Sequence, residues 1–175
     1  FQILDDEDSK SLMSQVMEEQ QITKQLITVN QLLSNVHMNK ATSNYIPYLL
    51  PNAQWPEETN TSTYLRYLQL QRKNYALDFN DIIYFTLYIF DTYTDALNYW
   101  QQQFDYIQVD EVQDCSNNDW QIINALSACS GNLFVVGDPD QAIYEWRGAK
   151  PDARVQFQAD TDIILDQNHR STPNI

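Results

Sequence analysis

The stretch that decides the fold is Phe104–Asp114, which reads FDYIQVDEVQD. Its first half holds tyrosine, isoleucine and valine between polar residues, which predicts a short buried strand. The strand should end at the neighbouring acids Asp110 and Glu111. Ligands of open α/β sheets bind at the carboxyl ends of the strands. An acid pair there can hold Mg²⁺ and orient a water molecule, although such a pair can also simply cap the next helix.

Two further apolar runs follow the same design. Residues 133–136 end in Gly137-Asp138-Pro139-Asp140-Gln141, and residues 163–165 end in the polar segment 166–171. A helical pattern separates the first run from Phe104–Asp114, with Trp120 on its buried face and Gly131 near its end. Three buried strands that each end in polar residues predict a nucleotide-binding α/β domain with a parallel sheet.

Four motifs carry a family resemblance. Residues 110–114 (DEVQD) resemble the Walker B motif of UvrD/Rep-type superfamily-one DNA helicases, and residues 136–149 (VGDPDQAIYEWRGA) resemble their motif III. Residues 165–171 (LDQNHRS) are similar to their motif IV, and residues 77–83 (LDFNDII) to their Asp-Phe-Asp-Asp-Leu segment. Four motifs in the family's order and approximate spacing are far more specific than any one of them.

The resemblance implies an α/β fold. It predicts a partial RecA-like parallel sheet of the P-loop NTPase type together with a mainly α-helical inserted subdomain. Residues 1–77 should form that subdomain, residues 78–165 the C-terminal part of the first motor domain, and residues 166–175 the start of the second.

The resemblance also implies an activity. The parent protein would be a cytoplasmic, ATP-dependent DNA helicase of 3′→5′ polarity, of the kind used in DNA repair. ATP and Mg²⁺ would be its cofactors, and single-stranded DNA and single-strand/duplex junctions its partners. Two alternatives stay open: the helicase part of a helicase–nuclease, and a helicase-like interaction module that is no longer a motor.

The motifs assign roles at the nucleotide. Asp110 would hold Mg²⁺, Glu111 would activate the attacking water, and Gln141 would contact the γ-phosphate or that water. Arg170 matches the family's arginine that reaches the γ-phosphate. His169 stands where the family usually has a tyrosine against adenine.

The same motifs assign roles at DNA. Tyr144, Trp146 and Arg147 form the segment that would couple the ATP site to DNA, with Trp146 stacking on a base. The alternative for Trp146 is a core tryptophan. Gln113 and Asp114 are expected to hold Asp110 and Glu111 in position from a second layer of residues.

The negative net charge argues against binding to DNA by overall electrostatic attraction to its phosphates. The net charge is −14 and the pI about 4.2, with six basic and twelve acidic residues in 1–103 and four and twelve in 104–175. Arg66, Arg72 and Lys73 form the only basic cluster before Phe104. They are either phosphate contacts or a solvated helix face.

The composition limits the size of the core and the classes of protein that are possible. The chain of 175 residues is 43% hydrophobic, enough for one core or two small ones, and holds no run approaching the roughly 20 apolar residues of a membrane span. Its two cysteines fit a reduced compartment. None of its three glycines belongs to a Gly-x-x-x-x-Gly-Lys-Ser/Thr loop. We therefore expect that loop to precede Phe1.

The N-terminal half is predicted to be helical. Asp8 should cap a helix through Met17, and a second helix should follow with Leu26 and Val36 on its apolar face. Residues 39–62 should be irregular, with Tyr45, Tyr48 and Trp55 either packed under a loop or stacking on DNA. Further helices are expected around 64–75, after a cap at Asp78 with Asp81 in the first turn, and around 97–104.

Overall fold

The computed structural model describes residues 1–23, 27–143, 149 and 157–167. It divides into two compact units, Phe1–Trp100 (unit 1) and Gln101–Ile175 (unit 2), and each is considered by itself. The domain boundaries predicted from the sequence stay predictions. Among the described residues, no helix combines the length and the apolar character needed to cross a bilayer.

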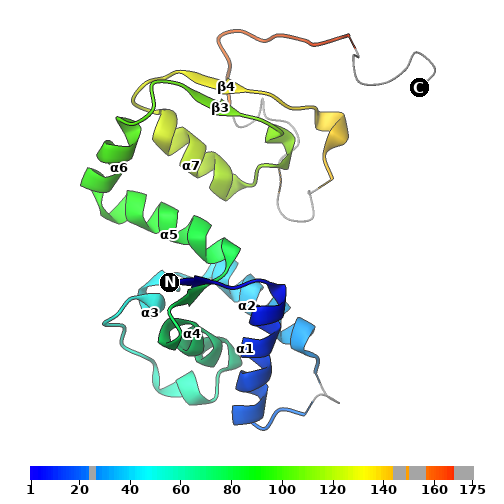
Figure 1. Ribbon diagram of the computed structural model, residues 1–175, viewed down its shortest axis with the longest axis vertical. Coiled ribbons are helices and arrows are strands. Elements are labelled where there is room, and N and C mark those ends of the chain that lie inside the picture. Colours follow the sequence, from blue (N-terminus) through cyan, green and yellow to red (C-terminus); the bar gives the residue numbers. More distant parts are fainter. Residues whose placement is uncertain (24–26, 144–148, 150–156, 168–175) are drawn as a thin grey trace, which may run out of the picture. The chain divides into compact units, whose positions relative to one another are not determined.

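Unit 1 is mostly helical, with one short parallel sheet (Figure 1). Its elements are β1 (Gln2–Ile3), α1 (Asp6–Glu19), α2 (Val29–Thr42), α3 (Ile46–Leu49), the 3-10 helix η1 (Glu57–Asn60), α4 (Thr63–Lys73), β2 (Ala76–Leu77) and α5 (Phe79–Thr92); α6 (Thr94–Gln101) begins in it. β1 pairs with β2 in register Gln2↔Ala76. This pairing brings the start of the chain beside residues that follow α4.

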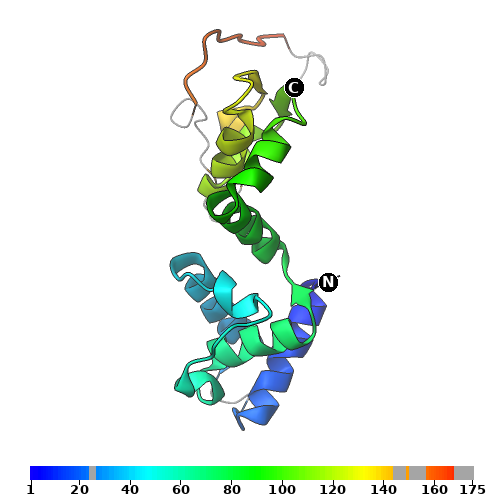
Figure 2. The same ribbon diagram turned by 90° about the vertical axis from the view of Figure 1, so that its left-hand side faces the viewer.

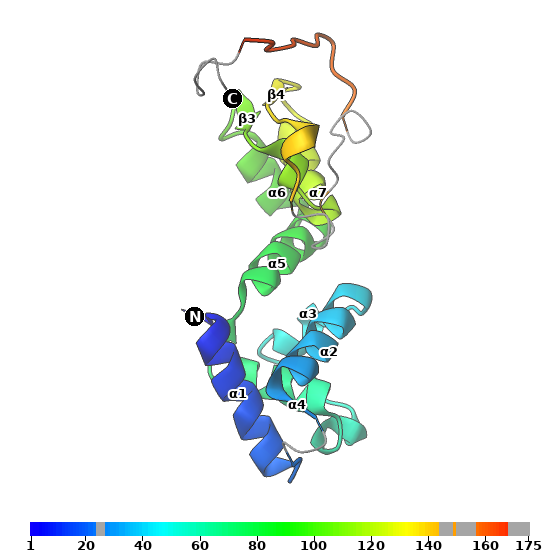
Figure 3. The same ribbon diagram turned by 90° about the vertical axis from the view of Figure 1, so that its right-hand side faces the viewer.

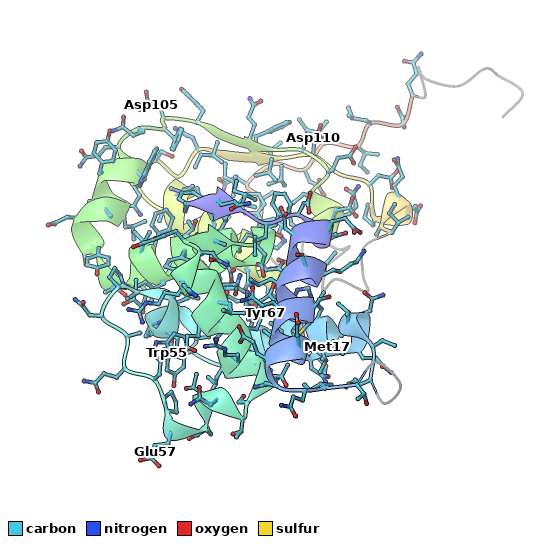
Figure 4. All side chains as sticks on the ribbon, turned by 60° about the horizontal axis from the view of Figure 1, so that its bottom comes forward. Met17, Trp55, Glu57, Tyr67, Asp105 and Asp110 are labelled. Atoms are coloured by element: carbon cyan, nitrogen blue, oxygen red, sulfur yellow. The ribbon has the colours of Figure 1, made fainter. Side chains whose placement is uncertain are left out.

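Helices α1, α2 and α4 pack against one another around the main core of unit 1 (Figure 3). Met13, Val16, Val36 and Tyr67 are each at most 1% exposed. In Figure 4 the side chains of Met17 and Tyr67 lie among these helices. Burial of this apolar surface is the main term that stabilises such a helical unit.

The cap of α1 differs from the sequence expectation. Asp5, not Asp8, is the N-cap residue, and its carboxylate accepts from the Asp8 N–H at 2.8 Å. Asp8 occupies the third helical position, where it completes a reciprocal capping box. Either acid satisfies the cap preference by residue type, so the sequence pattern alone left the position ambiguous.

Residues between α2 and α4 are irregular apart from α3 and η1 (Figure 2). The prediction of an irregular stretch over 39–62 is confirmed except at its start, because α2 continues through Thr42. Their aromatic residues pack within unit 1. Tyr45 is 1% exposed, and the rings of Tyr48 and Trp55 stack with centroids 5.4 Å apart. Arg72 donates to the carbonyl oxygens of Pro51 and Ala53, and its guanidinium lies 5.9 Å from the Trp55 ring centroid. The packing alternative for the three aromatics is therefore the one observed.

Unit 2 contains the predicted pair of parallel strands. Its elements are β3 (Ile107–Val109), the 3-10 helix η2 (Val112–Asp114), α7 (Asn117–Ser127), β4 (Leu133–Val135) and the 3-10 helix η3 (Pro139–Gln141). β3 and β4 pair in register Ile107↔Leu133. Trp120 on α7 is 1% exposed, as its predicted core position requires. Gly131, with φ of 67°, ends the helical segment in the left-handed conformation that glycine tolerates best.

The predicted third strand is wrong. Residues 163–165 have no strand conformation, and Ile163, Ile164 and Leu165 are 66–85% exposed. A strand forms only where a neighbour completes its hydrogen bonds. Within the described part of unit 2, no strand pairs with this segment. A run of β-forming residues in the sequence does not show whether a partner strand is available.

A buried charged cluster ties unit 1 together. The Lys40 ammonium on α2 lies 2.7 Å from carboxylate oxygens of both Asp78 and Asp81, at the start of α5. Asp81 also accepts from the Tyr45 hydroxyl at 2.6 Å and from the Gln71 side-chain amide at 2.9 Å. Lys40, Tyr45, Gln71 and Asp81 are each at most 2% exposed.

Asp78 and Asp81 form the predicted cap of α5. Each side chain accepts the backbone N–H of the other, at 2.8 and 2.9 Å, in a complete capping box. Burial raises the pKa of the Asp78 carboxyl, but the charge and hydrogen bond of Lys40 outweigh it and hold that pKa below its usual range. Burial and the nearby Asp81 charge raise the pKa of the Tyr45 hydroxyl, so it remains a donor.

Replacing Lys40 by methionine should strongly destabilise unit 1. The substitution keeps most of the side-chain volume but leaves two buried carboxylates without their cation, which costs about 3–5 kcal/mol. Urea unfolding followed by circular dichroism measures the loss. Lys10→Met is the matched control, because among the described residues Lys10 forms an ion pair only with Glu7, on the same helix, and it should unfold like the wild type. Equal stability of Lys40→Met and Lys10→Met would contradict the role given to the cluster.

Candidate active site at the ends of β3 and β4

The acid pair follows β3 directly and lies on the surface. Asp110 and Glu111 are both exposed, and Figure 4 shows Asp110 at the end of β3 opposite Asp105. The Asp110 carboxylate accepts the Glu111 N–H at 2.9 Å. Glu111 has φ 51° and ψ 41°, the left-handed conformation that costs a residue with a Cβ about 1–2 kcal/mol. Such strain persists where surrounding contacts impose it, and it is concentrated at functional sites.

Backbone hydrogen bonds impose this turn. The Val136 N–H donates to the Val109 carbonyl at 2.8 Å, and the Val112 N–H donates to the Val136 carbonyl at 3.0 Å. The second bond forms only because the chain turns sharply at Glu111 and brings Val112 back to the end of β4. Glu111 therefore sits at the apex of a turn that two strands hold from below.

Gly137 permits the close approach of these two strand ends. A Cβ atom at this position would lie 2.5 Å from Gln113 Oε1 and 2.8 Å from a methyl group of Val112. Neither contact is possible for a side chain, so the glycine is required by space and not by its own dihedral angles.

A hydrogen-bonded chain runs from Glu111 to Gln141. Gln113 Nε2 donates to Glu111 Oε2 at 2.8 Å, and Gln113 Oε1 accepts the Asp138 N–H at 3.1 Å. The Asp138 carboxylate accepts the Asp140 N–H at 3.0 Å, capping η3, and the Gln141 side-chain amide at 2.7 Å. Figure 1 shows η2 and η3 following β3 and β4 at the same edge of the sheet.

The structure thus brings three predicted site residues, Asp110, Glu111 and Gln141, to the carboxyl ends of two paired parallel strands. Gln113 braces the pair as predicted, and Asp114 lies beside it with one buried carboxylate oxygen that has no hydrogen-bond partner among the described residues. Five further predicted residues lie outside the described residues: Tyr144, Trp146, Arg147, His169 and Arg170.

The basic cluster of α4 is largely engaged within unit 1. Arg66 Nε lies 2.7 Å from Glu19 Oε2, and hydrogen bonding to Arg66 lowers the pKa of the Glu19 carboxyl. Arg72 holds the segment with Trp55. Together with Lys73 they line a groove of about 730 Å³. Two of the three cations therefore have intramolecular partners, which favours a structural role over phosphate contacts for these two.

Sequence reasoning missed two features of the site. One is the hydrogen bond from Gln113 to the loop after β4, which joins residues 25 positions apart. The other is the left-handed turn at Glu111, where residue type gives no signal. A contact between the segments DEVQD and GDPDQ could have been predicted from the sequence, because both begin at the ends of strands that were predicted to pair.

Comparison with known families agrees with this geometry. The family model for the UvrD/REP helicase N-terminal domain matches residues 1–162. The chain belongs to the UvrD/REP helicase family. The match includes both the helical unit 1 and the strand ends of unit 2, so the family's domain accounts for nearly the whole sequence.

Members of the UvrD/REP family with curated descriptions include several similar to this chain. An ATP-dependent DNA helicase PcrA of Leuconostoc citreum is 41% identical over 123 residues, which cover 68% of this chain and 16% of that protein. The PcrA helicases of Staphylococcus epidermidis and Bacillus subtilis are 33% and 31% identical over all of this chain and 25% and 24% of their own lengths. The chain therefore spans about a quarter or less of these relatives.

Replacing Gly137 by alanine should disrupt the site. The added methyl group collides with Gln113 and Val112, and overpacking of this kind costs about 1–3 kcal/mol. Nuclear magnetic resonance of the chain should show the side-chain amide signals of Gln113 displaced in Gly137→Ala.

Gly131→Ala is the control for this test. Gly131 has open space around its Cβ position but a φ of 67°, so alanine there adds backbone strain without a collision. It should lower stability while leaving the Gln113 amide signals in place. Unchanged Gln113 signals in Gly137→Ala would contradict the close approach described above.

Proposed function

We propose that the protein containing this chain hydrolyses ATP with Mg²⁺ and uses the energy to move along single-stranded DNA with 3′→5′ polarity. Its working substrate would be the junction of single-stranded and duplex DNA, as in DNA repair. The observation that carries the proposal is the hydrogen-bonded chain joining Glu111 to Gln141 across the ends of β3 and β4. Membership of the UvrD/REP family supports it.

Asp110 is the residue that would hold Mg²⁺. Its carboxylate is exposed at the strand end and supplies the hard oxygen donor that Mg²⁺ prefers. A single protein carboxylate suits this ion, which keeps several waters and binds phosphate oxygens. When bound, the ion would supply charge neutralisation at the phosphates.

Glu111 would orient and deprotonate the attacking water. Its backbone is fixed by the left-handed turn, and one carboxylate oxygen already accepts from Gln113, which leaves the other oxygen available for a water. Gln141 offers an amide that can donate to a γ-phosphate oxygen without competing for the metal. Phosphoryl transfer depends mainly on such positioning and charge stabilisation.

Residues carried over from the sequence motifs complete the proposal. Arg170 would stabilise charge on the γ-phosphate, and His169 would lie against the adenine. Tyr144, Trp146 and Arg147 would contact DNA, where stacking on Trp146 is worth about 1–3 kcal/mol per base. Stacking does not need bulk positive charge, and so it is compatible with the net charge of −14.

The competing function is a helicase-like interaction module without motor activity. The net charge of −14 favours it, because phosphate attraction supplies most non-specific DNA affinity. The intact set of Asp110, Glu111 and Gln141 favours the motor. A module that no longer hydrolyses ATP has no need for a strained glutamate beside an exposed aspartate.

Glu111→Gln should abolish ATP hydrolysis in the full-length protein. Removing a general base lowers kcat by about 100-fold or more, while the amide keeps the size needed for nucleotide binding. Steady-state hydrolysis with and without single-stranded DNA, and binding of a fluorescent ATP analogue, measure the two effects. Asp105→Asn, at the other end of β3, is the control and should keep wild-type turnover. A full-length protein whose ATP turnover is absent, or is not stimulated by single-stranded DNA, would favour the interaction module.

The chain of 175 residues should not hydrolyse ATP by itself. Its sequence contains no Gly-x-x-x-x-Gly-Lys-Ser/Thr loop, and without the amides and lysine of such a loop a triphosphate has no cradle. A radiolabelled-phosphate release assay on the purified chain tests this expectation. Ordinary turnover by the chain would show that the nucleotide is held in a different way.

A further inference from the structure

The side chain of Gln113 makes one hydrogen bond more than is needed to hold the Glu111 carboxylate. Its side chain is 2% exposed, and both ends of its amide are used. Nε2 donates to the Glu111 carboxylate at 2.8 Å, and Oε1 accepts the Asp138 N–H at 3.1 Å. Gly137 leaves the space that Oε1 occupies, because a Cβ there would lie only 2.5 Å away.

A side-chain amide can donate to Glu111 and accept from Asp138 without carrying a charge. It offers a donor and an acceptor at once, whereas a carboxylate offers no donor to Glu111 and adds like-charge repulsion. An apolar side chain of the same size would leave the Asp138 N–H without its acceptor. The residue type thus follows from its two partners.

The connection continues to Gln141. The Asp138 backbone is fixed by Gln113, and the Asp138 carboxylate in turn accepts the Gln141 amide at 2.7 Å and the Asp140 N–H at 3.0 Å. Glu111 and Gln141 are therefore linked through two intermediate residues. A shift of the loop after β4 moves the Asp138 N–H, and with it the amide that orients Glu111.

We propose that Gln113 is a positioning residue that couples the orientation of the Glu111 carboxylate to the loop carrying Gln141. The proposal rests on the ATPase function proposed above and adds a residue that makes the two sides of the site interdependent. The Glu111 backbone is fixed by the turn, but its side chain is exposed and needs a partner to hold one orientation. Gln113 is that partner, and its own position is set by the second strand end.

The first test uses ATP hydrolysis by the full-length protein stimulated with single-stranded DNA. Gln113→Met removes both hydrogen bonds, and Gln113→Glu keeps the acceptor but loses the donor. We expect kcat to fall about 10- to 100-fold in both, as for misplacement of a reacting group. KM for ATP should change little, because Gln113 is only 2% exposed and would not contact the nucleotide. Gln108→Met, on the exposed face of β3, is the matched control and should leave kcat unchanged.

A double-mutant cycle separates positioning from loss of stability. If Gln113 acts through the loop, Gln113→Met combined with Gln141→Leu should lower kcat by less than the product of the single effects. A purely structural role would lower the melting temperature and the active fraction, with additive effects. Additive losses, or an unchanged kcat in Gln113→Met and Gln113→Glu, would overturn the proposal.

The second test is independent of ATP hydrolysis and uses nuclear magnetic resonance of the 175-residue chain. Glu111→Gln should displace the Asp138 amide signal in the wild-type background and leave it in place when Gln113 is methionine. Equal displacement in both backgrounds, or none in either, would overturn the coupling. Should Gln113→Met fail to fold, Gln113→Leu, which also lacks both the donor and the acceptor, serves as the second background. An inactive full-length wild type would refute the proposed function, and this comparison would still decide the coupling.

Discussion

Unit 1 depends on one buried ammonium group. Lys40 faces two carboxylates, and a 1:2 ratio of charges would be unfavourable in a dry interior without further donors. The Tyr45 hydroxyl, the Gln71 amide and the first N–H groups of α5 supply them, and the positive end of the helix dipole adds to their effect. The cluster joins α2, α4 and α5 by groups that cannot be replaced singly. Its geometry fixes how the chain enters α5.

The Glu111 carboxylate of unit 2 is held differently from the carboxylates of Asp78 and Asp81. Glu111 is exposed, and within the described part of unit 2 its side-chain partner is the neutral amide of Gln113, not a cation. A lysine there would neutralise the charge, as Lys40 does for Asp78 and Asp81. A neutral donor orients the carboxylate and leaves its charge available to a water. The cationic partner in unit 1 serves stability, whereas the neutral partner in unit 2 fits the catalytic role proposed for Glu111.

Local signals predicted the strands β3 and β4, the capping box at Asp78 and Asp81, and the strand-end position of the acid pair. Each depends on residue type within a few positions. Long-range partners were not predictable in this way. Lys40 meets its acids 38 and 41 residues later, and nothing in its own neighbourhood marks it as buried. The wrong strand at 163–165 is the converse case, since its residues have the propensity and lack the neighbour that pairing requires.

The strained turn at Glu111 explains why the site needs both strands. The left-handed conformation costs about 1–2 kcal/mol. Two local side chains contact Glu111, because Asp110 accepts its N–H and Gln113 donates to its carboxylate. Further contacts come from β4, through the Val136 carbonyl that accepts from Val112 and the Asp138 N–H that donates to Gln113. β3 alone would relax to an ordinary extended end and turn Glu111 away. The orientation of Glu111 is therefore a property of the strand pair, and Gly137 leaves the space that Gln113 and Val112 occupy between the strand ends.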